Sequence, residues 1–294
     1  MKRSANTMRR RAVIAVFLLV LAVIGSSCAI RQQQMQQKLA ALEAMPGRFT
    51  FVVFGDNRSG DAVYQGVVTL AMKHKPDFVL NTGDEIATPG DLRQWSKFWE
   101  MSRPISVPYF LTVGNHDVNA MVPSSEQIYR EQVDLPGNKL YYSFIAGNSL
   151  FIVLDSCLKN QENKIVGEQY EWLEAVLAAS PQMHKFVFLH HPLYTERGKG
   201  KHAGDSMDKY APERDRLESL LIKYHVDTIF SGHEHYYARR EINGIQHIIT
   251  GGGGAPLYAE DKDGGFYHIV VVTVDGKTIS AETVDIDGKV RDRF

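Results

Sequence analysis

The feature that most constrains the fold is a short apolar run followed at once by a polar, glycine-containing loop, which recurs along the chain. The first three pairs of run and loop are Thr50–Phe54 with Gly55-Asp56, Asp77–Leu80 with Gly83-Asp84, and Pro108–Val113 with Gly114–Asp117. Runs of β-branched and aromatic residues that end in turn residues are typical of buried strands. Helical spacing over residues 61–75 and 91–102 lies between them, so the order predicts βαβ units and an α/β fold.

The second half of the chain continues this pattern. Lys185–Leu189 leads into His190-His191-Pro192, and Asp227–Phe230 leads into Ser231–His235. Helices are predicted at Gly167–Ala179 and Pro212–Tyr224, and antiparallel strands at Tyr141–Ile145, Ser149–Leu154, Phe266–Val274 and Thr278–Val284. Open α/β folds keep their sites at the carboxyl ends of the strands. The loops that follow these runs are therefore the first place to look for function.

The length and charge of the chain limit its function classes. At 294 residues it is long enough for one α/β domain, which we place at residues 48–294. Five basic residues and no acidic ones precede Cys28; without them the chain carries 28 basic against 34 acidic residues, a net charge of −6. A protein with a net negative charge is not expected to bind a nucleic-acid backbone, because such binding requires clustered Lys and Arg.

Residues 1–30 are predicted to be a targeting segment rather than part of the fold. Basic residues precede the apolar run Ala12–Ile24, and small residues precede Cys28. A lipoprotein signal with Cys28 lipidated is the first interpretation, an uncleaved membrane anchor the second, and a cleaved secretory signal the third. All three place the protein outside the cytoplasm, and the first two attach it to a membrane. The glutamine-rich segment 31–47 is expected to form a helical or flexible stalk.

The loops after five of the predicted strands carry a mixed set of oxygen and nitrogen donors. In chain order these donors are Asp56, Asp84, Asn115 with His116, His190 with His191, and His233 with His235. Imidazole and carboxylate together suit Fe, Mn or Zn better than Ca or Mg, which prefer oxygen ligands. A carboxylate such as Asp84 can bridge two cations about 3.5–4 Å apart, and such a pair can clamp a phosphoryl group during its transfer. The pattern therefore favours a site for two metal ions.

Together these loops resemble the five-block signature of the calcineurin-like metallophosphoesterases, the superfamily that includes the purple acid phosphatases. The blocks are Gly55-Asp56, Gly83-Asp84, Gly114–Asp117, His190-His191-Pro192 and Gly232–His235, so the resemblance covers residues 50–254. It implies an α/β (α+β) fold of the metallo-dependent phosphatase type, a four-layer αββα sandwich with two mixed β-sheets. It also implies a phosphoesterase that acts on a phosphate monoester or diester of a small molecule.

The resemblance, carried over position by position, also implies how the donors are shared between two ions. Asp56 and His235 would bind the first metal ion, and Asp84 would bridge it to the second. The other ligands of the second ion would be Asn115, His190 and His233. The ions are expected to be Fe, Mn or Zn.

Four further residues are expected at or near the site. By the resemblance, His116 would be the catalytic residue, which binds no metal and donates a proton or hydrogen bond to the substrate oxygen. For Asp117, orientation of His116 and capping of the turn are both open. His191 could support the ligands, face the substrate or belong only to the turn. His202 lies in the glycine-rich loop 195–210, a natural substrate-facing lid, where contact with substrate and no role are both open.

Two positions depart from the family pattern. Many relatives carry a histidine two residues after the first aspartate, where this chain has Arg58. The purple acid phosphatases carry a tyrosine three residues after the bridging aspartate, where this chain has Ala87. The first ion is therefore expected to lack one protein ligand, a gap that water or Asn57 could fill. Arg58 could hold a phosphate oxygen with its guanidinium group or form a structural ion pair.

Two classes of function follow from these residues. The first is a metal-dependent phosphoesterase outside the cytoplasm, in which a hydroxide activated by two metal ions attacks phosphorus. The second is a non-catalytic or weakly active, membrane-tethered binding protein with an incomplete first metal site, because a fold does not imply an activity. Arg58 supports the second class, whereas the complete set of Asn115, His190 and His233 supports the first.

Overall fold

The computed structural model describes residues 32–195, 202 and 204–294. The predicted targeting segment 1–30 lies outside the described residues. Residues 32–43 are helical, and the assignment of 31–47 as a stalk stays a prediction. The chain divides after Ala41 into two compact units, of which residues 42–294 contain all the described strands. Among the described residues, no helix has both the length and the apolar composition needed to cross a membrane.

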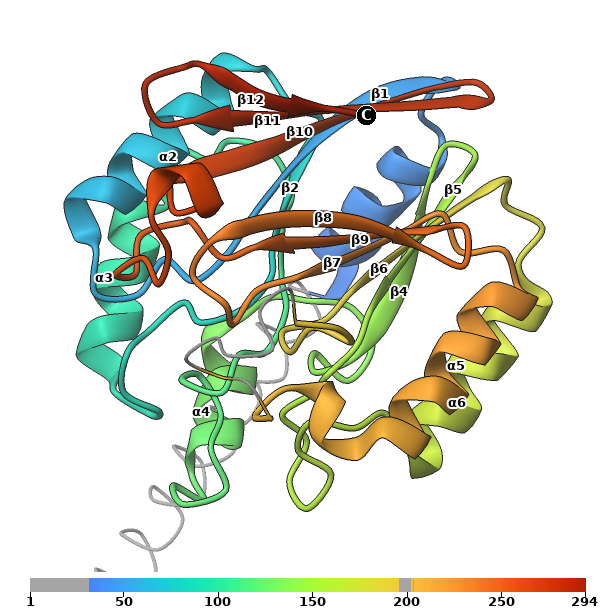
Figure 1. Ribbon diagram of the computed structural model, residues 1–294, viewed down its shortest axis with the longest axis horizontal. Coiled ribbons are helices and arrows are strands. Elements are labelled where there is room, and N and C mark those ends of the chain that lie inside the picture. Colours follow the sequence, from blue (N-terminus) through green and yellow to red (C-terminus); the bar gives the residue numbers. More distant parts are fainter. Residues whose placement is uncertain (1–31, 196–201, 203) are drawn as a thin grey trace, which may run out of the picture. The chain divides into compact units, whose positions relative to one another are not determined.

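Residues 42–294 are built on two six-stranded mixed sheets (Figure 1). The first sheet has the order β12 (Val290–Arg293), β11 (Thr278–Asp285), β10 (His268–Asp275), β1 (Arg48–Phe54), β2 (Phe78–Asn81) and β3 (Tyr109–Leu111). The second has the order β4 (Tyr142–Ala146), β5 (Ser149–Val153), β6 (His184–Phe188), β7 (Thr228–Ser231), β9 (Ile245–Thr250) and β8 (Tyr237–Ile242). The neighbours β1, β2 and β3 are parallel, as are β5, β6, β7 and β9. The predicted βαβ units therefore form one half of the first sheet, with β3 at its edge, and the centre of the second sheet.

Helices cover the outer face of each sheet (Figure 1). They are α2 (Asp61–Lys73) and α3 (Leu92–Met101) on the first sheet and α5 (Gly167–Ala179) and α6 (Ala211–Lys223) on the second, while α4 (Ser125–Gln132) lies in the connection between β3 and β4. On the first sheet, the Tyr64 ring of α2 lies between Phe54 of β1 and Phe98 of α3. On the second sheet, Leu173 of α5 and Leu217 of α6 belong to one core cluster with residues of β5, β6 and β7. These layers confirm the predicted αββα sandwich.

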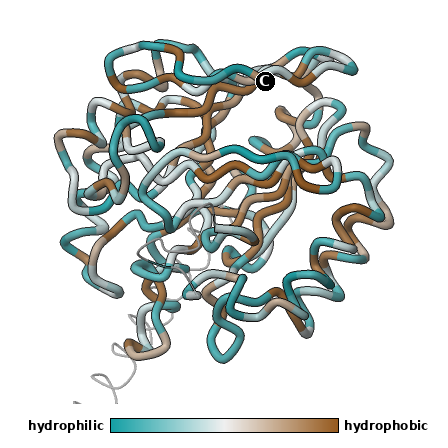
Figure 2. Tube along the Cα trace, in the orientation of Figure 1, coloured by the Kyte–Doolittle hydropathy of each residue, from teal (hydrophilic) through white to brown (hydrophobic). Residues whose placement is uncertain are grey.

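Aromatic rings fill the space between the two sheets. Phe51 of β1 packs edge-on against Phe151 of β5 and Phe186 of β6, with ring centroids 5.1 Å apart in both pairs. All three side chains are fully buried. The inner strands read as continuous apolar runs because both of their faces are covered, and Figure 2 shows their hydrophobic residues at the centre of the fold. This rigid core fixes the strand ends from which the site is built.

The strand β8 and the helix α4 are two elements that the sequence pattern does not predict. β8 has the sequence Tyr-Ala-Arg-Arg-Glu-Ile and lies at the edge of the second sheet, where charged side chains remain partly exposed. Such an edge strand lacks the alternation that marks a half-buried strand. The other element, α4, is a short polar helix with two buried residues. Both owe their structure to tertiary contacts.

Candidate metal centre

The five predicted loops converge because β1, β2 and β3 of one sheet and β6 and β7 of the other end on the same side of the sandwich (Figure 1). Three site residues adopt left-handed backbone conformations, with φ of 56° at Asp56, 62° at Asp84 and 68° at His233. Such conformations cost of order 1–3 kcal/mol each and persist where neighbouring groups hold them. Here the His233 backbone N–H donates to Asp56 Oδ2 at 2.9 Å, so one strained loop fixes another.

Glycines allow the loops to approach each other this closely. A Cβ atom at Gly232 would lie 2.4 Å from Asp56 Oδ2. A Cβ atom at Gly253 would lie 2.3 Å from the carbonyl oxygen of Gly55, to which the Gly253 N–H in fact donates at 2.8 Å. The run Gly251–Gly254 is therefore a place of close backbone approach to the site rather than a nucleotide-binding loop.

One cluster of donors consists of Asp56, Asp84 and His235. Their donor atoms all lie within 4.8 Å of one another, and all three side chains are buried. His235 Nε2 lies 3.5 Å from Asp56 Oδ1. The other ring nitrogen, Nδ1, donates to the carbonyl oxygen of Pro256 at 2.8 Å. A histidine held in this way presents a fixed Nε2 lone pair, which is the usual arrangement for a metal ligand.

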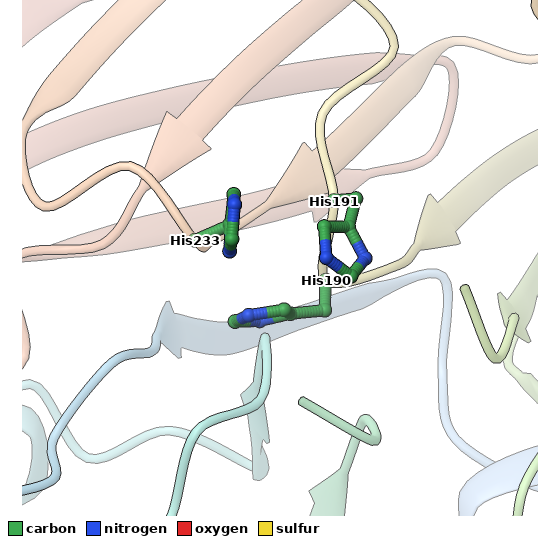
Figure 3. A group of neighbouring side chains, drawn as sticks. All are labelled: His190, His191 and His233. Carbon is green, nitrogen blue, oxygen red and sulfur yellow. The ribbon is translucent and has the colours of Figure 1, made fainter. Parts of the chain in front are cut away.

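A second cluster consists of His190, His191 and His233, whose rings gather around a common space (Figure 3). Asn115 Oδ1 joins them, 3.0 Å from His190 Nε2 and 3.0 Å from His233 Nδ1. His190 Nδ1 donates to the carbonyl oxygen of Thr82 at 2.9 Å, so its Nε2 faces the cluster. His233 Nε2 is buried and has no hydrogen-bond partner among the described residues. This second group is thus a cage of nitrogen donors with one amide oxygen.

Asp84 lies between the two clusters. Its Oδ1 is 3.4 Å from His190 Nε2 in the second cluster, while its Oδ2 accepts from Arg58 Nε at 2.9 Å. Burial alone would raise the pKa of Asp84, but the cationic groups of His190, His116 and Arg58 together lower it to about 2. The carboxylate is therefore ionised and in contact with donors of both groups, as a bridging ligand must be.

Burial sets the protonation of two members of the second cluster, whereas at His190 burial lowers the pKa but the charges of Asp84 and Asp56 outweigh it and raise the pKa. Burial lowers the pKa of His233 and of His191 well below the ordinary histidine value, and the neighbouring imidazoles lower both further. Both rings are therefore neutral, which is the form that binds metal. Neutral imidazoles, together with a His190 ring held by a carbonyl oxygen, fit a set of ligands for metal ions of the Fe, Mn or Zn class.

His116 and Asp117 occupy the loop after β3. His116 Nδ1 donates to the carbonyl oxygen of Ala87 at 2.8 Å, and its backbone N–H donates to Asp84 Oδ1 at 3.0 Å. Asp117 accepts from the backbone N–H groups of Asp84, Gly114 and Ile86. These contacts connect the loops of Asp84 and His116, and the carbonyl oxygen of Ala87 holds the His116 ring, while both roles considered for Asp117 stay predictions.

The remaining predicted residues also reach the site. Arg58 forms the structural ion pair that the sequence left open, with side chains 15% exposed for Arg58 and 1% for Asp84. His191 Nδ1 lies 2.9 Å from Ser156 Oγ, and the His191 ring is 4.4 Å from that of His233. The ring of His202 lies 4.3 Å from that of His233. Residues 196–201 and 203 of the predicted lid lie outside the described residues.

Sequence reasoning missed two residues beside the site. The ring of Tyr258 stacks on that of His235, with centroids 4.0 Å apart and an interplanar angle of 18°. The buried carboxyl of Glu85 follows Asp84 directly, and burial together with the charge of Asp117 raises its pKa well above the usual range. The glycine run before Tyr258 was a signal that this segment approaches the site. Nothing in the local sequence marked Glu85, because an acid in a loop is usually exposed.

Comparison with known proteins supports the same interpretation. The model of the calcineurin-like phosphoesterase family matches residues 49–237. Probable inactive purple acid phosphatase 1 of Arabidopsis thaliana is 27% identical over 269 residues, covering 75% of this chain and 43% of that protein. Purple acid phosphatase 22 of the same plant is 29% identical over 238 residues, covering 66% of this chain and 52% of that protein.

A solved structure shares the fold. Purple acid phosphatase PPD1 from yellow lupin (Lupinus luteus) seeds aligns with a TM-score of 0.71 at 24% identity, over 85% of this chain and 54% of that chain. The chain thus spans about half the length of the purple acid phosphatases that it matches. The predicted family and fold class are confirmed. Because the family match covers all five loops and more than half of the chain, the chain belongs to the calcineurin-like phosphoesterase family.

Proposed function

We propose that this protein is a metal-dependent phosphoesterase that hydrolyses a phosphate monoester or diester. The observation that carries the proposal is the pair of buried donor clusters with Asp84 between them, on a chain of the calcineurin-like family. The substrate class follows from the family, and the net negative charge of the folded body argues against a nucleic acid as the substrate.

In this proposal the first ion is held by Asp56, Asp84 and His235. The second ion is held by Asn115, His190 and His233, and it shares Asp84 with the first. The distances between neighbouring donors, 3.0–3.5 Å, support this division. When bound, a pair of Fe, Mn or Zn ions supplies Lewis acidity, which activates water and stabilises charge on the phosphoryl oxygens.

Side chains of the protein then orient the substrate and donate a proton to its leaving oxygen. His116 Nδ1 is held by the Ala87 carbonyl, so Nε2 is the nitrogen that donates to the leaving oxygen. The Asp117 carboxylate holds the loops of Asp84 and His116 together by accepting hydrogen bonds from backbone N–H groups of both loops. His191 and His202 lie against His233 and are candidates for contact with the substrate. Arg58 holds the shared carboxylate, and its contact with phosphate stays a prediction.

We also propose that the protein works outside the cytoplasm, attached to a membrane through its N-terminus. The basis is the basic and apolar sequence before Cys28. Mass spectrometry of the mature N-terminus tests this directly. A lipidated Cys28 or an intact apolar segment in the membrane fraction supports the proposal, and recovery in the cytoplasmic fraction contradicts it.

A non-catalytic binding protein on this fold is the second candidate. The observation that favours it is the first cluster, which has Arg58 and Ala87 at the positions where active relatives are expected to carry further ligands. One of the similar Arabidopsis proteins is itself described as probably inactive. Both candidates predict metal binding, so only turnover separates them.

The test is hydrolysis of a generic aryl phosphate by the purified protein after metals are removed and Mn, Fe or Zn is added back. We expect two ions per chain, turnover, and a loss of at least about 100-fold in His233→Ala, since even groups that only support ligands are worth 10–100-fold. His225→Ala is the matched control, because His225 is exposed and has a φ of 54°, close to the 68° of His233. Absence of turnover with every metal, or wild-type turnover in His233→Ala, would refute the phosphoesterase.

A further inference from the structure

Tyr258 reaches the first cluster through the glycine run that follows β9. Beyond Gly253, the backbone N–H of Ala255 donates to the carbonyl oxygen of Asp56 at 2.7 Å. The backbone N–H of Tyr258 then donates to the carbonyl oxygen of His235 at 3.1 Å. The segment is therefore fixed at both ends to loops that carry donors of the first cluster. Its side chain has a defined position there.

The hydroxyl of Tyr258 lies 3.4 Å from His235 Nε2. This is the nitrogen that faces the cluster, because Nδ1 is held by Pro256. Two donors, each about 2.0–2.2 Å from one ion, are separated by about 2.9–4.3 Å for angles of 90–180° at the metal. The distance between Oη and Nε2 falls inside this range, as does the 3.5 Å between Nε2 and Asp56 Oδ1.

The stacking of Tyr258 on His235 defines where the hydroxyl can reach. The two ring centroids are 4.0 Å apart and the ring planes are within 18° of parallel, so the phenol ring lies face to face with the imidazole. This arrangement places Tyr258 Oη next to His235 Nε2. Packing alone would require only the ring, so the hydroxyl is the atom whose role needs a test.

We propose that Tyr258 is a fourth protein ligand of the first metal ion and binds through its phenolate oxygen. The proposal rests on the proposed metal site, and it gives that ion the oxygen ligand that Ala87 does not supply. On binding, the phenol O–H bond breaks, the oxygen lone pair forms the bond to the metal, and the proton leaves to solvent. No oxidant or reductant is needed.

Ferric iron provides a readout independent of turnover, because a phenolate bound to Fe(III) gives a charge-transfer band in the visible spectrum. The full-length protein, stripped of metal and loaded with Fe(III), is compared with Tyr258→Phe, which keeps the stacked ring and removes the hydroxyl. We expect the wild type to show the band. The variant should lose the band and bind iron at the first site at least about tenfold more weakly.

Tyr141→Phe is the matched control, because Tyr141 also packs against an aromatic ring, that of Trp172 with centroids 5.1 Å apart, and belongs to neither donor cluster. It should keep both the band and the iron. A band and iron content unchanged in Tyr258→Phe would overturn the proposal, as would an iron-loaded wild type without the band. Resonance Raman spectra of the iron-loaded wild type test the same point without a variant, because a phenolate bound to iron has characteristic vibrations. Turnover without the band refutes only the role of Tyr258, whereas the band without turnover refutes only the phosphoesterase.

Discussion

Acidification from about pH 8 to about pH 5 should destabilise the metal-free protein through one buried histidine, His268. This residue begins β10 beneath the glycine run, and its backbone N–H donates to the carbonyl oxygen of Gly252 at 3.1 Å. Its Nδ1 lies 2.9 Å from the carbonyl oxygen of Phe266, and its Nε2 lies 3.1 Å from Thr250 Oγ1. The side chain is fully buried, and burial lowers its pKa to about 4.

The size and sign of the effect follow from this pKa. Unfolded histidine titrates near about pH 6.5, so between there and pH 4 the unfolded state binds a proton that the folded state does not. The contribution of His268 is therefore fully present above the unfolded pKa and is lost as the pH falls toward 4. A folded-state pKa of about 4, against about 6.5 in the unfolded state, corresponds to about 3 kcal/mol in total, of which about 2 kcal/mol is lost by pH 5.

Urea unfolding at the two pH values measures this loss. The wild type is compared with His268→Gln, which keeps hydrogen-bonding groups in place but does not titrate. Other buried groups such as His191 and His233 make the same contribution to the pH dependence of stability in the wild type and in the variant. The difference between the pH dependences of the two proteins is therefore due to His268. The free energy of unfolding should fall by about 2 kcal/mol less in the variant. An equal pH dependence in both would refute the reasoning, and His225→Gln should behave as wild type.

Two further substitutions test the architecture of the site. Arg58→Ala should lower the free energy of unfolding of the metal-free protein by about 3 kcal/mol, because it leaves Asp84 buried beside one cation fewer, whereas Arg48→Ala at an exposed ion pair should cost less than about 1 kcal/mol. Urea unfolding measures both losses of stability, and equal losses in the two variants would contradict the prediction. A raised KM in Arg58→Ala would show in addition that Arg58 contacts the phosphate of the substrate. Gly253→Ala should lower stability by at least about 2 kcal/mol and reduce metal content, because its Cβ would lie 2.3 Å from the carbonyl oxygen of Gly55. Gly47→Ala, whose Cβ would meet nothing closer than 4.0 Å, is the control, and metal analysis showing equal content in both variants would count against the role of the turn.

The parts of this structure that local chemistry specifies were predictable from the sequence. Apolar runs such as Lys185–Leu189 predicted strands because both faces of the central strands are buried, which leaves a continuous hydrophobic signal. The Gly-Asp and Gly-Asn-His-Asp loops were recognisable because glycines permit close approach of the loops that carry the donors. The family signature then supplied the two-sheet sandwich, which periodicity alone does not specify.

What the sequence could not provide are contacts between distant segments. Tyr258 is 23 residues beyond His235 and stacks on it only because the glycine run carries the chain back across the loop of Asp56. The orientation of His116 depends on the carbonyl oxygen of Ala87, a backbone atom that no side-chain pattern reveals. β8 is a strand because β9 pairs with it, although its own residues are those of a charged edge. In each case the deciding partner lies elsewhere in the chain.

The way His233 and His235 serve different clusters follows from the backbone between them. The N–H of Glu234 donates to the carbonyl oxygen of Gly232 at 2.8 Å, and that of Tyr236 donates to Glu234 at 2.8 Å, so two tight three-residue turns follow each other. They aim one imidazole at Asn115 and the other at Asp56. Asp56 also accepts the N–H of His233, so a carboxylate assigned to the first ion holds the backbone of a ligand of the second. The two proposed metal sites are therefore structurally coupled, because displacement of the Asp56 loop or of the His233 loop must disturb both sites.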